Sequence, residues 1–149
     1  MEILLTSHGQ TQWNLLKKVQ EKADIELNEK GIQQAEETRD SLKNEKIDLI
    51  LCSPLKRAIQ TAEIINQERN YKMIIDERVS ERDFFERVYN FLDSIKNEYA
   101  GKRMLIVAHG GISIPVKCYF EVIPNAETLL PLCIRNCEVA KYYYKELER

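Results

Sequence analysis

Short apolar runs alternate along this chain with segments whose apolar residues recur every three or four positions. The apolar runs predict β-strands at residues 3–6, 47–52, 72–75 and 104–108. The helical spacing predicts helices at residues 13–19, 28–43, 53–65, 84–99 and 112–120. Strands that alternate with helices in this way are typical of an α/β fold. We therefore expect a three-layer α/β/α sandwich with a mostly parallel sheet.

Capping residues and burial patterns sharpen several of these boundaries. Asn28 is expected to cap a helix that buries Ile32. Ser53 is expected to cap the following helix, with Pro54 at its first position. The stretch 139–144 predicts an edge strand near the end of the chain. With 149 residues and no internal repeat or linker, residues 1–149 are interpreted as a single domain.

Composition argues against several classes of partner. A formal net charge of −2 gives no reason to expect nucleic acid or a membrane surface. No apolar run approaches the roughly 18 residues of a membrane-spanning helix, and the first residues lack a signal pattern. The four cysteines lack the spacing of a zinc site, which favours reduced thiols in a cytoplasmic protein. We expect no metal and no cofactor.

The two histidines occupy the same local context. His8 follows the first predicted strand between Ser7 and Gly9, and His109 follows a later strand and precedes Gly110. The carboxyl ends of parallel strands lie at one edge of a sheet, where helix N-termini favour anions. A lone histidine in such a loop is more often structural. The repeated context instead favours one shared site.

Charged residues follow two further predicted strands. Arg57 is expected in the first turn of the helix after strand 47–52, and Glu81 and Arg82 follow strand 72–75. The same sheet edge is therefore predicted to gather two imidazoles, a guanidinium and a carboxyl group. The competing interpretation is that these are ordinary solvated charges near strand ends.

Motifs surround these residues in order along the chain: Leu5 to Asn14, Asp24 to Leu27, Ser53 to Ala62, Glu81-Arg82, and Val107 to Gly111. Together they resemble the histidine phosphatase superfamily, in its phosphoglycerate mutase-like branch. The resemblance covers nearly the whole chain, and the segment around Arg57 is its most specific part. It implies a phosphoglycerate mutase-like fold.

The resemblance also implies a role for each candidate residue. His8 would be the nucleophile that becomes a phosphohistidine, while Arg57 and His109 would hold the phosphoryl oxygens. Glu81 would be the general acid that protonates the leaving oxygen. The residues implied to bind the phosphate or the substrate are Ser7, Gly9, Asn14, Arg82 and Gly110. The implied activity is that of a phosphoric monoester hydrolase acting on a small phosphorylated metabolite, as a monomer or homodimer.

The chain departs from the family pattern in three places. Ser7 stands where the family has an arginine that contacts the phosphoryl group, and Glu21 stands where glycine is common. The lid segment that normally follows the general acid is shortened. Losing one charge-assisted contact costs about 1.5–3 kcal/mol, so we expect reduced activity. A mutase must keep water from its phosphorylated form, so a short lid favours hydrolysis over mutase activity.

Two other interpretations stay open at this point. The chain is alternatively a catalytically weak or inactive relative that binds phosphorylated ligands or a protein partner. A third interpretation is that Ser7 and the shortened lid are alterations of an otherwise intact natural sequence. Neither the physiological substrate nor the oligomeric state is determined by the residues.

Overall fold

A five-stranded sheet forms the centre of the molecule, with its strands in the order β3-β2-β4-β1-β5. The computed structural model describes residues 1–18, 20, 23–80, 85–121 and 133–145. The strands that run parallel are β1 (Glu2–Ser7), β2 (Leu49–Cys52), β3 (Lys72–Ile75) and β4 (Arg103–Ala108). The fifth strand, β5 (Val139–Tyr143), pairs antiparallel with β1 at the sheet edge. The predicted mostly parallel sheet with an added edge strand is confirmed.

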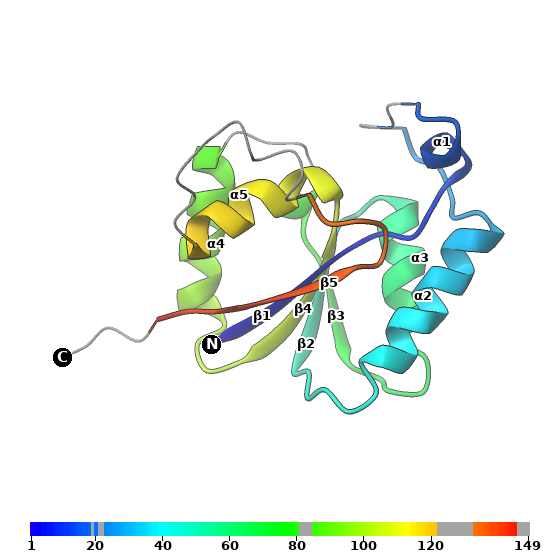
Figure 1. Ribbon diagram of the computed structural model, residues 1–149. Helices are drawn as coiled ribbons and strands as arrows, with labels where there is room; N and C mark the ends of the chain where they lie inside the picture. Colours follow the sequence, from blue (N-terminus) through cyan, green and yellow to red (C-terminus); the bar gives the residue numbers. More distant parts are fainter. Residues whose placement is uncertain (19, 21–22, 81–84, 122–132, 146–149) are drawn as a thin grey trace.

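Helices cover both faces of this sheet (Figure 1). The helices on one face are α2 (Glu29–Ser41) and α3 (Lys56–Ile65), and those on the other are α4 (Phe85–Glu98) and α5 (Gly110–Phe120). Alternate residues of β1 point to opposite faces: Ile3 and Leu5 pack with α4 and α5, whereas Leu4 packs with α3. Because both faces are covered, the middle residues of the central strands are apolar and buried, and the predicted three-layer sandwich is confirmed.

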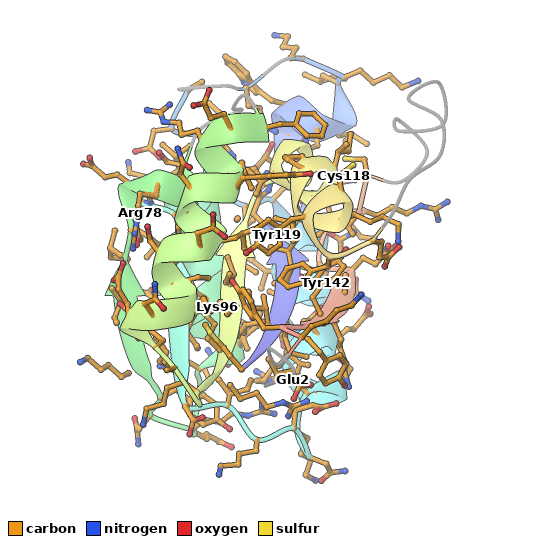
Figure 2. The ribbon with its side chains drawn as sticks, turned by 90° about the vertical axis from the view of Figure 1, so that its left-hand side faces the viewer. Glu2, Arg78, Lys96, Cys118, Tyr119 and Tyr142 are labelled. Carbon is orange, nitrogen blue, oxygen red and sulfur yellow. The ribbon has the colours of Figure 1, made fainter. Side chains whose placement is uncertain are left out.

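An aromatic cluster, in which Tyr119 and Tyr142 take part, holds β5 against α4 and α5 (Figure 2). The Phe120 ring of α5 stacks on the Tyr142 ring of β5, with centroids 5.0 Å apart. The Tyr119 hydroxyl donates to Asp93 of α4 over 2.6 Å, and the Tyr144 hydroxyl donates to the Leu92 carbonyl over 2.8 Å. These contacts hold the edge strand in place, while hydrogen bonds of Asn136 and Cys137 attach the preceding segment to the end of β1.

The first helix, α1 (Gln12–Leu15), is shorter than the predicted helix at 13–19. It begins with a capping box, in which the Thr11 hydroxyl accepts from the Asn14 backbone and the Asn14 side chain accepts from the Thr11 backbone. The helix ends as Lys17 takes a left-handed conformation, with φ 56°. A short 3-10 turn, η1 (Glu77–Val79), follows β3.

The start of α2 is as predicted, but one of its buried positions is not. The Asn28 side chain accepts from the Gly31 backbone over 2.8 Å, so the predicted cap is confirmed. Ile32 is 42% exposed, so its predicted burial is wrong. The physical reason is a close backbone contact, because a Cβ on Gly31 would lie 2.1 Å from the Gln10 oxygen. That contact turns the face with Gly31 and Ala35 inward and leaves Ile32 outside.

The predicted start of α3 is wrong. The helix begins at Lys56 rather than Pro54, and Ser53 does not cap it. Instead, the carboxylate of Asp24 accepts from the Lys56 backbone over 2.8 Å. Ser53 is buried, and its hydroxyl contacts the His109 ring. A serine that reads as a cap in the sequence is therefore part of the site.

The four cysteines are free thiols, and Cys52 and Cys137 are buried. Burial raises the pKa of the Cys52 thiol to about 12, which makes it an inert core residue. Within the described ranges, no helix is long and apolar enough to cross a membrane.

Candidate active site

The two histidines meet at the carboxyl edge of the sheet, where their strands end side by side. Ser7 of β1 pairs with Ala108 of β4, and the His8 backbone donates to the Ala108 carbonyl over 3.1 Å. The His8 and His109 rings lie with their centroids 5.3 Å apart, at an angle of 61°. The parallel pairing of β1 with β4 thus brings together two side chains that are far apart in sequence, as the repeated motif predicts.

The His8 ring is held in one tautomer by its own loop. Its Nδ1 lies 2.7 Å from the Gly9 carbonyl oxygen, which can only accept a hydrogen bond. The proton therefore sits on Nδ1, and Nε2 keeps its lone pair. Burial, with the nearby Arg57 charge, lowers the pKa of His8 to about 4, although the Gly9 contact raises it. His8 is accordingly a neutral, nucleophilic imidazole at pH 7.

The His109 ring is also neutral. Burial, the His8 ring and the Arg57 charge lower its pKa to about 3. Its Nε2 lies 2.8 Å from the Ser53 hydroxyl, which follows the end of β2 at the same edge. A bound anion favours the protonated form of a nearby imidazole, so His109 is suited to gain a proton when phosphate enters. The sequence analysis named Ser53 only as a helix cap, although its position directly after a strand could have marked it as a site residue.

Arg57 lies in the first turn of α3 and is almost fully buried. Its guanidinium donates to the Ala23 carbonyl over 2.6 Å. Its own carbonyl accepts from the Thr61 hydroxyl over 2.7 Å, and Thr61 accepts from the Gly9 backbone over 3.0 Å. One turn of α3 therefore connects the predicted arginine to the loop that carries His8.

Gly9, which directly follows His8, helps to position the His8 ring. Both backbone polar groups of Gly9 are engaged, the N–H with Thr61 and the carbonyl with His8. A Cβ on Gly9 would lie 2.5 Å from the Gly31 oxygen, so the two backbones approach as closely as only glycine permits. The structure therefore places Gly9 as a support of the His8 ring.

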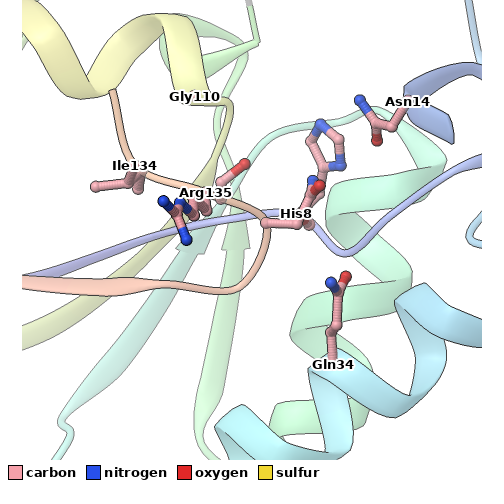
Figure 3. A pocket seen from close by; sticks show the side chains of 8 residues that line it. His8, Asn14, Gln34, Gly110, Ile134 and Arg135 are labelled. Atoms are coloured by element: carbon pink, nitrogen blue, oxygen red, sulfur yellow. The ribbon is translucent and has the colours of Figure 1, made fainter. Parts of the chain in front are cut away.

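A pocket of about 510 Å³ opens beside His8 (Figure 3). Its lining residues are Ser7, His8, Asn14, Gln34, Gly110, Ile134, Arg135 and Asn136. The Asn14 side-chain oxygen accepts from the Thr11 backbone, which leaves the Asn14 amide N–H groups as donors for the pocket. Three candidates besides His8, namely Ser7, Asn14 and Gly110, thus line this pocket.

The segment before β5 forms one wall that sequence reasoning missed. The Asn136 amide donates to the His8 carbonyl over 2.9 Å, and the Cys137 backbone donates to the Ser7 carbonyl over 3.1 Å. Thr38 of α2 donates to the Cys137 carbonyl over 2.8 Å. Cys137 has a left-handed backbone with φ 58°, an unusual conformation for a residue with a side chain. No pattern in the sequence marks this wall.

Three residues named in the sequence analysis, Glu81, Arg82 and Glu21, lie outside the described residues. Their implied roles stay predictions. The described part of the site consists of two neutral imidazoles and a buried guanidinium at the carboxyl edge of a parallel sheet. Such an arrangement defines an α/β protein with a site suited to an anionic group.

Comparison with known protein families names the class more closely. The model of the histidine phosphatase superfamily (branch 1) matches residues 3–86 and 80–148. The matches together span nearly the whole sequence. The chain belongs to the histidine phosphatase superfamily.

Individual relatives and solved structures agree with this assignment. The chain is 36% identical over 137 residues to a Bacillus subtilis protein named uncharacterized phosphatase PhoE, covering 72% of this chain and 71% of that protein. It is 36% identical over 107 residues to a Cronobacter sakazakii protein named probable phosphoglycerate mutase GpmB, covering 72% of this chain but only 50% of that relative. The structure of Bacillus stearothermophilus YhfR has the same fold, with a TM-score of 0.84 and 24% identity, over 94% of this chain and 89% of that one.

Proposed function

We propose that this chain is a phosphatase that hydrolyses small phosphomonoesters through a phosphohistidine on His8. The observation that carries the proposal is the neutral His8 ring, whose Nε2 lone pair is set by the 2.7 Å contact from Nδ1 to Gly9. Membership in the histidine phosphatase superfamily supports it, as does similarity to a relative named a phosphatase.

In the first step, His8 Nε2 attacks the phosphorus atom and the bond to the ester oxygen breaks. Charge on the transferred phosphoryl oxygens is stabilised by the buried Arg57 guanidinium and by His109. The dianion raises the pKa of His109, which in its protonated form donates a hydrogen bond to a phosphoryl oxygen. By resemblance, the leaving oxygen takes its proton from Glu81.

In the second step, water attacks the phosphohistidine and the P–N bond breaks. Glu81, now a carboxylate, accepts the proton of the attacking water. His8 returns to its neutral form with the proton on Nδ1, and inorganic phosphate leaves. The Gly9 carbonyl holds the ring in one orientation through both steps, because it accepts from Nδ1 in each state.

Two features favour hydrolysis at a reduced rate over mutase activity. The shortened lid inferred from the resemblance leaves the phosphohistidine open to water. Ser7 lines the pocket with an uncharged hydroxyl where the family pattern has a cation. Removal of one preorganised donor lowers turnover by about 10²–10³.

The second candidate function is binding of a phosphorylated ligand or a protein partner without turnover. The same uncharged Ser7 favours it, because a site that holds an anion needs less charge than a site that transfers one. The variant Ser7→Arg separates the two candidates. A rise in turnover by orders of magnitude supports an enzyme that lacks one contact, and no change supports the binding protein.

The phosphatase proposal is tested by the variant His8→Ala, assayed with para-nitrophenyl phosphate. Wild type is expected to release phosphate and to give an acid-labile, alkali-stable phosphoprotein after rapid quenching, whereas the variant gives neither. The substitution Lys72→Gln, at the opposite end of the sheet, provides a control that keeps both signals. Equal phosphate release by wild type and His8→Ala would overturn the proposal.

A further inference from the structure

Among the described residues that line the pocket beside His8, Arg135 is the one with a charged side chain. The other lining residues carry hydroxyl, amide, backbone or apolar groups, and His8 itself is neutral. Figure 3 shows the Arg135 guanidinium on the opposite side of His8 from the Asn14 and Gln34 side chains. The positive charge of this pocket therefore lies at one end, away from α1 and α2.

The backbone around Arg135 is fixed on both sides. The Ile134 backbone donates to the Ser113 hydroxyl of α5 over 3.1 Å, and the Asn136 amide donates to the His8 carbonyl over 2.9 Å. The Glu138 backbone donates to the Arg135 carbonyl over 3.1 Å, which closes a turn at this point. The backbone that carries the Arg135 guanidinium is thus held in place on both sides, and on one side by a hydrogen bond to His8 itself.

The Arg135 side chain itself is exposed. Within the described ranges, it makes no ion pair and no side-chain hydrogen bond. The other arginine of the site, Arg57, is buried and committed to the Ala23 carbonyl. The two guanidinium groups are therefore suited to different tasks, Arg57 to a desolvated phosphoryl group and Arg135 to an anion that stays partly in water.

We propose that Arg135 binds a second acidic group of the substrate, one that is not transferred. The inference rests on the proposed phosphatase function and adds the substrate class: phosphomonoesters that carry a further carboxylate or phosphate. A planar guanidinium offers paired N–H donors that match either group. Because the contact is partly solvated, it acts on selectivity and KM rather than on the chemical step.

The test compares para-substituted phenyl phosphates that differ in one group: a carboxylate, its methyl ester, or a second phosphate. Wild type is expected to prefer both acidic compounds over the neutral ester by kcat/KM. The variant Arg135→Gln is expected to lose about five- to twentyfold of that preference through KM, with the neutral ester unaffected. Arg135→Lys is expected to keep part of the preference.

Lys72→Gln is the matched control, because it removes one exposed positive charge at the amino end of β3, the opposite edge of the sheet. It is expected to keep the full preference. Preference for the carboxylate alone or for the phosphate alone identifies which acidic group the pocket takes. An unchanged preference in Arg135→Gln overturns the inference, and so does an equal loss on all three compounds.

A binding measurement separates this inference from the proposed function. In the His8→Ala background, titration calorimetry with the same three compounds reports affinity without turnover. Tighter binding of the acidic compounds that is lost in His8→Ala/Arg135→Gln supports Arg135 even where phosphatase activity fails. Equal affinities in the two proteins overturn it even where phosphatase activity is found.

Discussion

The two ends of strands β1 and β4 handle charge in opposite ways. At the amino end, Glu2 and Arg103 are paired in register, and the Arg103 guanidinium donates to Glu2 over 2.9 Å. At the carboxyl end, the same strands lead into the buried His8 and the half-buried His109, which are both neutral. One end compensates its charges internally, whereas the other keeps titratable groups uncharged beside a buried Arg57.

The difference shows that only the carboxyl end carries a costly arrangement of charge. Ion pairs near solvent, such as those of Arg103, contribute little and cost little. Burying the Arg57 charge is costly, and a hydrogen bond to the Ala23 carbonyl helps to hold its guanidinium in place. A buried and positioned guanidinium of this kind is suited to bind an anionic ligand.

The largest expected effect follows from removing the charge of Arg57. Arg57→Gln is expected to lower kcat by about 10²–10³, because the phosphoryl oxygens lose a preorganised charged donor. The measurement is steady-state hydrolysis of para-nitrophenyl phosphate. The neighbouring Lys56→Gln is the control, since Lys56 is exposed and its substitution changes the net charge equally. Equal losses of kcat in both variants would show that the total positive charge near α3, and not the position of the Arg57 guanidinium, determines the rate.

A second prediction concerns stability between pH 6.5 and pH 5. The pKa of His8 falls from its ordinary value of 6.5 to about 4, and that of His109 to about 3, chiefly through burial. In this window the unfolded chain binds more protons than the folded one, so stability is full above pH 6.5 and falls as the pH drops. The expected loss is about 2 kcal/mol for each histidine at pH 5. Urea unfolding in a buffer without phosphate measures it.

The amino end provides the contrast in the same experiment. Hydrogen bonds from Arg103 and Lys141 lower the pKa of the Glu2 and Glu45 carboxyls below their ordinary 4.5, so their contribution is lost only at lower pH. The variant His109→Asn should remove about half of the loss between pH 6.5 and 5, because His8 remains. A wild-type profile that is already flat there would contradict the assignment of neutral buried histidines.

The sequence predicted most of the fold because its signals are local and repeated. Strand patterns, the Asn28 cap and the shared context of His8 and His109 each arise within a few residues, and parallel pairing then brings the histidines together. The sequence also placed Arg57 correctly, since its position in the first turn after β2 follows from strand and helix order alone. The convergence of these three side chains was thus predictable without coordinates.

The remaining parts depend on contacts between distant segments. Ser53 is predicted to cap α3, but Asp24 accepts from the Lys56 backbone at the start of this helix, and the Ser53 hydroxyl contacts His109. Gly31 reads as a weak helix residue, yet its close contact with Gln10 decides which face of α2 is buried. Asn136, near the other end of the chain, donates a hydrogen bond to the His8 carbonyl, and no local sequence pattern predicts this contact.

The smallest expected effect comes from the amino end. Arg103 contacts Glu2, the Lys46 carbonyl and Glu45, the last over 2.6 Å, and Glu45 also pairs with Lys141. Arg103→Met is expected to lower the free energy of unfolding by about 0.5–1 kcal/mol, because such pairs are screened by solvent. The difference from wild type should shrink in 1 M NaCl, where the Debye length is about 3 Å. Phosphatase activity is expected to be unchanged, so a loss of turnover in Arg103→Met would show that the two ends of the sheet are coupled.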